Sequence, residues 1–154
     1  MNLATNTANS REGARADNSI AILCVDDNLL VLEALAMRLG REPGIRCVGT
    51  LLNAGTLEDE AARLSPDVVV IDLDMPGRCP LQAVCALAHS RPETRAVFFT
   101  GHVSRELVDR AIEAGAWGYI CKEDGEGALI DAVKRVREGE IVFANAAQGA
   151  MCRL

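Results

Sequence analysis

The sequence predicts an α/β sandwich built around a parallel sheet of five strands. Five short apolar runs alternate along the chain with five stretches whose apolar residues recur at helical spacing, which is typical of repeated strand–helix units. A chain of 154 residues with 49% hydrophobic content is long enough to bury one core. Since only 3% of the residues are aromatic, we expect that core to be aliphatic.

The expected strands are the five apolar runs. In the third run, four consecutive aliphatic residues from Val68 to Ile71 carry Asp72 to the C-terminal end, and Met75-Pro76-Gly77 follows as a turn signal. The first run similarly ends at the acidic pair Asp26-Asp27. The strands are expected at residues 20–25, 45–50, 67–72, 95–100 and 117–121.

Five helices are expected between and after these strands. Ser104 is expected to cap the N-terminus of the fourth helix, and Gly139 follows the last apolar position of the fifth. The apolar stripes that predict the helices run from Leu29 to Leu39, Thr56 to Leu64, Leu81 to Ala88, Leu107 to Ile112 and Leu129 to Val136.

The two ends of the chain fall outside this pattern. Residues 1–18 are polar, have short side chains and show no periodicity, so we expect a disordered leader. Residues 140–154 form a tail that is too short for another domain. Its sequence leaves open whether it adds a turn of helix, a strand-like arm or a partner contact.

Charge and cysteine usage exclude several classes of protein. The net charge of −6 argues against a general binder of nucleic acid or of membrane surfaces, which needs a basic face. No apolar run reaches transmembrane length, and the first segment lacks the apolar centre of a signal peptide. The six cysteines show no C-x-x-C pair and no metal-ligand spacing. We therefore expect a cytoplasmic protein with reduced thiols.

Polar residues with useful chemistry follow four of the five expected strands. Right-handed crossovers place the C-terminal ends of parallel strands at one edge of the sheet, where ligands of such folds bind. We therefore expect three carboxylates, a hydroxyl and an ammonium to converge there: Asp26, Asp27, Asp72, Thr100 and Lys122.

Such a cluster suits a divalent cation and a phosphoryl group. Two carboxylates at roughly 5 Å repel each other by about 3 kcal/mol at an effective dielectric constant near 20, and Mg²⁺ offsets this repulsion. Asp72 could then attack a phosphoryl donor, with Mg²⁺ and Lys122 neutralising the transferring group and Thr100 donating its hydroxyl to one phosphoryl oxygen. Taken singly, Asp26-Asp27 could equally be a helix cap and Asp74 a solvated loop residue. His89 and His102 have no partner spacing and are expected at the surface.

Four segments carry these residues in order: VDDN at 25–28, PDVVVIDLDMPG at 66–77, FTGH at 99–102 and AGAWGYICK at 114–122. Together they resemble the receiver domain of two-component response regulators, most closely the NarL/FixJ-type branch. The resemblance covers about residues 20–139 and implies a receiver domain at 19–139. It also implies a flavodoxin-like, doubly wound (βα)5 fold with strand order 2-1-3-4-5.

The resemblance further implies specific roles for these residues. Asp72 would be phosphorylated by a histidine kinase or a phosphotransfer protein. Mg²⁺ would be held by Asp27 and Asp72, by Asp26 mainly through water, and by the backbone carbonyl of Asp74. Thr100 and Tyr119 would form a switch that changes the affinity of one face for a downstream protein or a second copy of the chain. The domain would be a self-catalysed phosphoacceptor with slow autodephosphorylation, not a turnover enzyme.

The sequence departs from the family pattern at several positions. Cys79-Pro80 stand where an acidic residue and Gly are usual, so we expect this loop and the start of the third helix to differ, and Glu123 stands where Pro is frequent. NarL/FixJ-type proteins usually carry a C-terminal helix-turn-helix, and this chain ends before one could fit, so we expect no direct nucleic-acid contact by this chain. Three alternatives stay open: an output-less or truncated DNA-binding regulator that acts by dimerisation, a Mg²⁺-dependent phosphohydrolase using Asp72 and Asp74, and a degenerate receiver that binds without phosphorylation.

Overall fold

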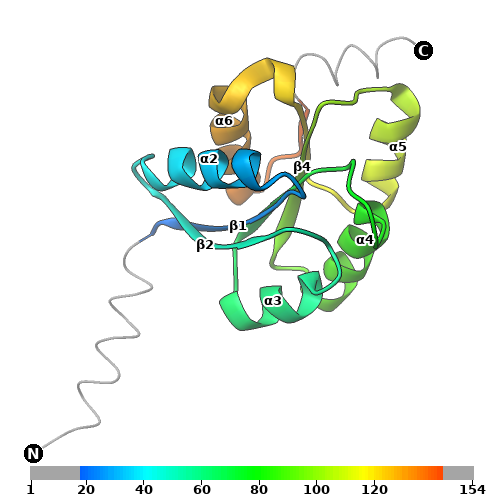
Figure 1. Ribbon diagram of the computed structural model, residues 1–154, viewed down its shortest axis with the longest axis horizontal. Helices are drawn as coiled ribbons and strands as arrows, with labels where there is room; N and C mark the ends of the chain where they lie inside the picture. Colours follow the sequence, from blue (N-terminus) through cyan, green and yellow to red (C-terminus); the bar gives the residue numbers. More distant parts are fainter. Residues whose placement is uncertain (1–17, 144–154) are drawn as a thin grey trace, which may run out of the picture.

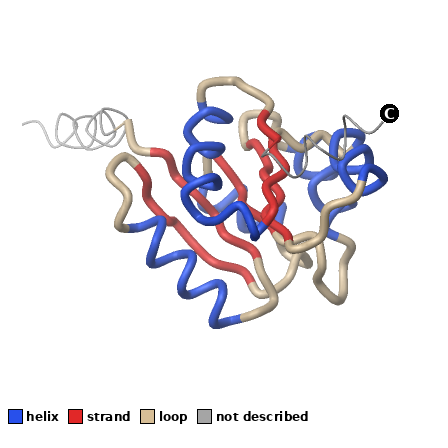
Figure 2. The backbone as a smooth tube through the Cα atoms, turned by 90° about the horizontal axis from the view of Figure 1, so that it is seen from above, coloured by secondary structure: helices blue, strands red, loops and turns tan. Residues whose placement is uncertain are grey.

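A computed structural model describes residues 18–143 and shows a parallel sheet with helices on both faces (Figure 1). Figure 2 shows the strands lying side by side between the two helical layers. The strands are β1 (Ile20–Val25), β2 (Ile45–Leu51), β3 (Val68–Ile71), β4 (Arg95–Thr100), β5 (Gly118–Cys121) and β6 (Val142–Phe143). The helices are α2 (Leu29–Gly40), α3 (Leu57–Leu64), α4 (Pro80–Ser90), α5 (Arg105–Glu113) and α6 (Gly125–Arg137), with a short 3₁₀ helix, η1 (Lys122–Asp124).

The sheet has six strands in the order β2-β1-β3-β4-β5-β6, and every neighbouring pair is parallel. The predicted α/β class and the order 2-1-3-4-5 are confirmed, but the prediction of five strands is wrong. Gly139, with φ of +97°, follows α6 in a conformation that favours glycine and lets the chain turn back toward the sheet. The backbone N–H of Val142 then donates to the carbonyl of Trp117 at 2.9 Å, and β6 pairs with β5.

The sheet separates two apolar clusters. On one face, residues of β1, β3 and β4 pack with α3, α4 and α5, and on the other face the alternate residues of these strands pack with α2 and α6. All four residues of β3 are buried, since helices cover both of its faces. Among the residues that the structure describes, the largest fully buried side chains include two aromatic rings, Tyr119 and Phe98, so the core is mainly aliphatic as expected.

Local side chains start the helices that flank the sheet's C-terminal edge. The side chain of Asn28 accepts hydrogen bonds from the backbone N–H groups of Leu30 and Val31, which begins α2 directly after the acidic pair. Ser104 caps α5 by accepting from the N–H of Leu107, as predicted. Helix α4 begins at Pro80, whose fixed φ and missing N–H suit the first helical position.

The expected leader at 1–18 lies outside the described residues except for Asn18, and so does the tail from residue 144 onward. Residues 140–143 of the expected tail form the approach to β6 and β6 itself. Within the part of the chain that the structure describes, no helix combines the length and apolar character needed to cross a membrane.

Candidate metal-binding and phosphoacceptor site

Strands β1 and β3 end side by side and thereby place two aspartates next to each other. Val25 lies opposite Ile71 in the parallel register, so the following residues, Asp26 and Asp72, leave the sheet at the same edge. The backbone N–H of Asp72 donates to the carbonyl of Val25 at 3.0 Å, and that of Asp26 donates to Leu51 at 3.0 Å. The sheet's own hydrogen bonds therefore fix both backbones before any ligand binds.

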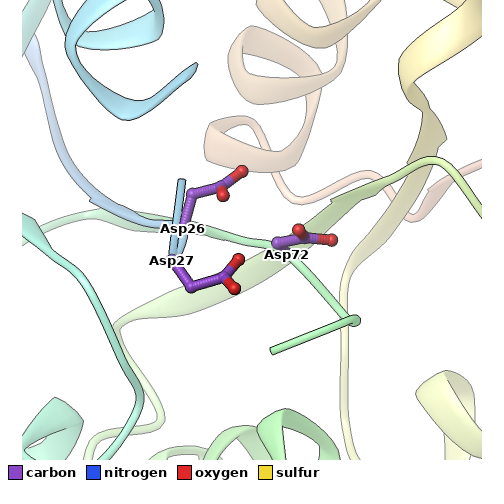
Figure 3. A group of neighbouring side chains, drawn as sticks. All are labelled: Asp26, Asp27 and Asp72. Carbon is purple, nitrogen blue, oxygen red and sulfur yellow. The ribbon is translucent and has the colours of Figure 1, made fainter. Parts of the chain in front are cut away.

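Three carboxylates gather at this edge. Asp26, Asp27 and Asp72 each offer an oxygen atom, and these atoms lie within 4.8 Å of one another. Figure 3 shows the two side chains from the end of β1 beside the one from the end of β3. Asp26 and Asp72 are only 3% and 7% exposed, whereas Asp27 is exposed. Carboxylate oxygens are the ligands that Mg²⁺ prefers, so the donor set fits such a cation.

An ammonium from β5 reaches the same carboxylates. Lys122 begins η1 directly after β5, and its Nζ donates to Asp26 Oδ2 at 3.1 Å and to Asp72 Oδ2 at 3.3 Å. Burial alone would lower the pKa of Lys122, but the hydrogen bond to Asp26 and the charge of Asp72 outweigh it and raise this pKa. The side chain is therefore a charged ammonium between two buried acids at neutral pH.

Asp72 is held in an environment that resists its ionisation. Burial raises the pKa of Asp72, and the nearby charge of Asp26 adds to this rise. The N–H of Asp74, which donates to Asp72 Oδ1 at 3.2 Å, and the ammonium of Lys122 act in the opposite direction. A divalent cation beside Asp72 would favour the ionised form in the same way as Lys122 does. Without such a cation, the positive charge of Lys122 does not fully offset the effects of burial and of Asp26 on the pKa of Asp72.

The hydroxyl predicted for the site comes from the end of β4. Thr100 is completely buried and lies opposite Cys121 of β5, one residue before Lys122. Its Oγ1 accepts the backbone N–H of His102 at 3.3 Å. The structure therefore brings Thr100 to the same sheet edge as the carboxylates and ties it to the loop that follows β4.

The proposed switch tyrosine occupies a buried position. The ring of Tyr119 lies 6.2 Å from that of Phe98, centroid to centroid, and its hydroxyl donates to the backbone carbonyl of His102. Burial is the main cause that raises the pKa of Tyr119 to about 12, and the charges of Cys121 and Asp72 add to it. The hydroxyl is therefore protonated at neutral pH and serves as a hydrogen-bond donor.

His102 connects these parts, a role that the sequence did not reveal. Asp74 and His102 are both exposed, as expected, but the His102 Nε2 lies 3.3 Å from Asp74 Oδ2. His102 thus joins Asp74 through its ring, Thr100 through its N–H and Tyr119 through its carbonyl. The two loops lie 28 residues apart, so no local pattern could have indicated the contact.

A second unpredicted contact anchors the loop after β3. The guanidinium of Arg78 pairs with the Glu58 carboxylate through both of its terminal nitrogens, with Nη2 at 2.9 Å from Oε2. Nη1 also donates to the carbonyl of Ala54 at 3.4 Å. The hydrogen bond from Arg78 lowers the pKa of Glu58, so the pair is ionic at neutral pH. The segment that follows β3 is therefore fastened to the start of α3.

The chain is similar to proteins of one known family. Residues 22–134 match the family model of the response regulator receiver domain. The response regulator GacA of Pseudomonas viridiflava is 32% identical over 121 residues, which are 79% of this chain and 56% of that protein. The transcriptional regulatory protein DegU of Brevibacillus brevis is 29% identical over 123 residues, 80% of this chain and 52% of that protein. The chain therefore spans little more than half the length of these relatives.

Solved structures give the same picture. A crystal structure of a LuxR-family two-component response regulator from Aurantimonas sp. SI85-9A1 superposes with a TM-score of 0.83 and 27% identity. The match covers 87% of this chain and 96% of that chain. The isolated receiver domain of RcsB from Salmonella enterica, solved with a phosphomimetic beryllofluoride, has a TM-score of 0.78 at 17% identity, covers 86% of this chain and 99% of that chain, and supports the fold alone.

Proposed function

Because this chain belongs to the response regulator receiver domain family, we propose that it accepts a phosphoryl group on Asp72 and thereby switches a protein-interaction face. One observation carries the assignment of the residue. Asp72 is a buried carboxylate that belongs to the acidic cluster, contacts the Lys122 ammonium and stands at the end of β3. Asp26 shares these contacts, and each of the two aspartates accepts the N–H of the residue two positions later, so the choice of Asp72 rests on the segment PDVVVIDLDMPG at 66–77, which resembles the phosphoacceptor strand of the family.

The donor would be a phosphohistidine of a histidine kinase or of a phosphotransfer protein. A carboxylate oxygen of Asp72 attacks the phosphorus in line, the bond from phosphorus to the imidazole nitrogen breaks, and its electron pair stays on that nitrogen. The product is an acyl phosphate on Asp72. Since Asp72 is already held by the Asp74 N–H and by Lys122, its carboxylate is oriented before the donor arrives.

Mg²⁺ would be held by the carboxylates of Asp27 and Asp72, by Asp26 mainly through water, and by the backbone carbonyl of Asp74. When bound, it supplies positive charge to the transferring group. Lys122 supplies the second positive charge, and it lies close enough to Asp72 to contact a phosphoryl oxygen after a small movement. We propose that the acyl phosphate is lost by slow autodephosphorylation and that the domain does not turn over a small substrate.

The response to phosphorylation would pass through Thr100 and Tyr119. If the Thr100 side chain moves so that its hydroxyl donates to a phosphoryl oxygen, the position of Oγ1 changes and so does its present contact with the His102 N–H. Because the Tyr119 hydroxyl binds the carbonyl of the same residue, a movement of His102 reaches the tyrosine directly. The face formed by α5, β5 and α6 would then change its affinity for a downstream protein or for a second copy of the chain. We propose that this occurs in the cytoplasm and without contact between this chain and DNA.

Phosphorylation by acetyl phosphate with Mg²⁺ tests the acceptor. Wild type should gain one phosphoryl group by intact-mass measurement, and Asp72→Asn should gain none. Asp59→Asn is a matched control, because Asp59 is an exposed aspartate on α3 and its replacement should leave labelling unchanged. Equal labelling of Asp72→Asn and wild type would reject Asp72 as the acceptor. Chelation of Mg²⁺ should abolish labelling of wild type.

A further inference from the structure

The short strand β6 pairs with the outer edge of β5, the strand that carries Tyr119. We call residues 140–143 the C-terminal arm. The arm is attached by the hydrogen bond from the Val142 N–H to Trp117, and Val142 itself is only 4% exposed. At its start, Glu140 forms an ion pair with Arg135 of α6 at 2.6 Å. The arm is therefore docked at both of its ends.

The sequence of β5 accommodates the arm. A Cβ atom at Gly118 would lie 3.3 Å from the Val142 carbonyl oxygen and 3.1 Å from the side chain of Val97. Glycine at this position lets the backbone of the arm approach β5 closely. The close fit indicates that the arm is an integral part of the sheet.

Phe143 lies opposite Tyr119 in the β5–β6 register, so both side chains stand on the same face of the sheet. Phe143 packs against the apolar cluster that contains Tyr119, Phe98 and Val108 of α5. Without β6, β5 would be the edge strand and its tyrosine would have no neighbour on that side. With β6 in place, Tyr119 is completely buried.

We propose that Phe143 is a positioning residue of the switch: from the C-terminal arm, it holds the ring of Tyr119 in the buried position. The inference rests on the proposed function, since Tyr119 matters only if the site is phosphorylated. Coupling between two sites is reciprocal. The docked arm favours the buried position of Tyr119. If activation at Asp72 requires the same position, activation in turn strengthens the attachment of the arm to β5.

The chain has one tyrosine, so a fluorinated tyrosine introduces a single fluorine NMR reporter at position 119. In the full chain without activator, Phe143→Ala should shift and broaden this signal, because the ring then samples more than one position. Phe143→Leu retains apolar bulk and should restore the wild-type signal. Ile141→Ala is the matched control on the same arm, since Ile141 is 63% exposed, and should change nothing.

Activation with Mg²⁺ and beryllofluoride tests the reciprocal effect. In wild type, the Val142 amide should become more protected from hydrogen exchange, by about fivefold, which is the lower end of usual coupling between sites. Phe143→Ala should weaken beryllofluoride binding by the same factor. A folded Phe143→Ala protein whose fluorine signal and beryllofluoride affinity both equal those of wild type would overturn the proposal.

A second variant and the fluorine signal without activator separate failure of the arm's role from failure of the proposed function. If Phe143→Ala does not fold, Val142→Pro removes the N–H that binds Trp117 and thereby detaches the arm from β5, and the same two readouts apply. If wild type takes up no beryllofluoride, the proposed function fails. The fluorine comparison without activator still decides whether the arm positions Tyr119.

Discussion

Replacing Lys122 with Met should destabilise the metal-free protein by about 2 kcal/mol. The ammonium lies 3.1 Å from Asp26 and 3.3 Å from Asp72. At an effective dielectric constant of about 20, each contact is worth roughly 5 kcal/mol before desolvation is subtracted. Breaking a buried ion pair costs about 3–5 kcal/mol and breaking an exposed pair about 0–1 kcal/mol. Since the Lys122 side chain is 30% exposed, an intermediate loss is expected, and Met preserves most of the apolar stem.

Urea unfolding with a chelator and with increasing Mg²⁺ measures the effect. Loss of the ammonium leaves two buried carboxylates without their cation, so the variant should bind Mg²⁺ more tightly than wild type. Saturating Mg²⁺ stabilises both proteins, and the gap between them narrows by RT ln of the ratio of their Kd values, so about 30-fold tighter binding by the variant would close a gap of about 2 kcal/mol.

Lys134→Met is the matched control. Lys134 pairs with Glu42 at 2.9 Å on the surface, and its side chain is 47% exposed. Its replacement should cost less than about 1 kcal/mol, with no dependence on Mg²⁺. Equal losses for the two variants, or a Lys122→Met deficit that Mg²⁺ does not change, would refute the assignment of Lys122 as part of a cation-dependent site.

Three further outcomes are expected. Arg78→Ala and Glu58→Ala should each lower the free energy of unfolding by about 1 kcal/mol and the double variant by no more, in a urea double-mutant cycle; additive losses would exclude a direct interaction. Without Mg²⁺, Asp72→Asn should exceed wild type in stability above about pH 4, because burial raises the pKa of Asp72 and the unfolded chain releases this proton first. Urea titrations across pH measure this, and equal stability at neutral pH would contradict it. Iodoacetamide should modify Cys47 as the pH passes about 7, since the hydrogen bond with Cys24 lowers the pKa of Cys47 to about 7. Peptide mapping that finds Cys47 unmodified until about pH 9 would contradict this.

The strands were predictable because their signal is continuous in sequence. The ranges 20–25 and 95–100 agree residue for residue with β1 and β4, since each contains an apolar run bounded by polar residues: Asp26 follows the first run, and Arg95 and Thr100 flank the second. The convergence of Asp26, Asp72 and Lys122 was predictable for a different reason. Parallel strand direction and right-handed crossovers determine which strand ends share an edge, so position along each strand is enough.

Contacts that depend on loop conformation were not predictable. The Arg78–Glu58 and His102–Asp74 pairs join segments 20 and 28 residues apart, and their geometry follows from how each loop leaves the sheet. Strand β6 has only two residues, too few for any hydrophobic period to appear. Its place was determined by the turn at Gly139 and by the room that Gly118 leaves beside β5.

The short β6 also bears on how copies of this chain can associate. A bare β5 would offer a row of unpaired backbone groups, a template on which a strand of another molecule could add. Val142 and Phe143 occupy that template, and within residues 18–143 these two alone extend the sheet beyond β5. Self-association through this side of the molecule is thereby directed to helix surfaces, and continuous sheets that run from one copy into the next are disfavoured.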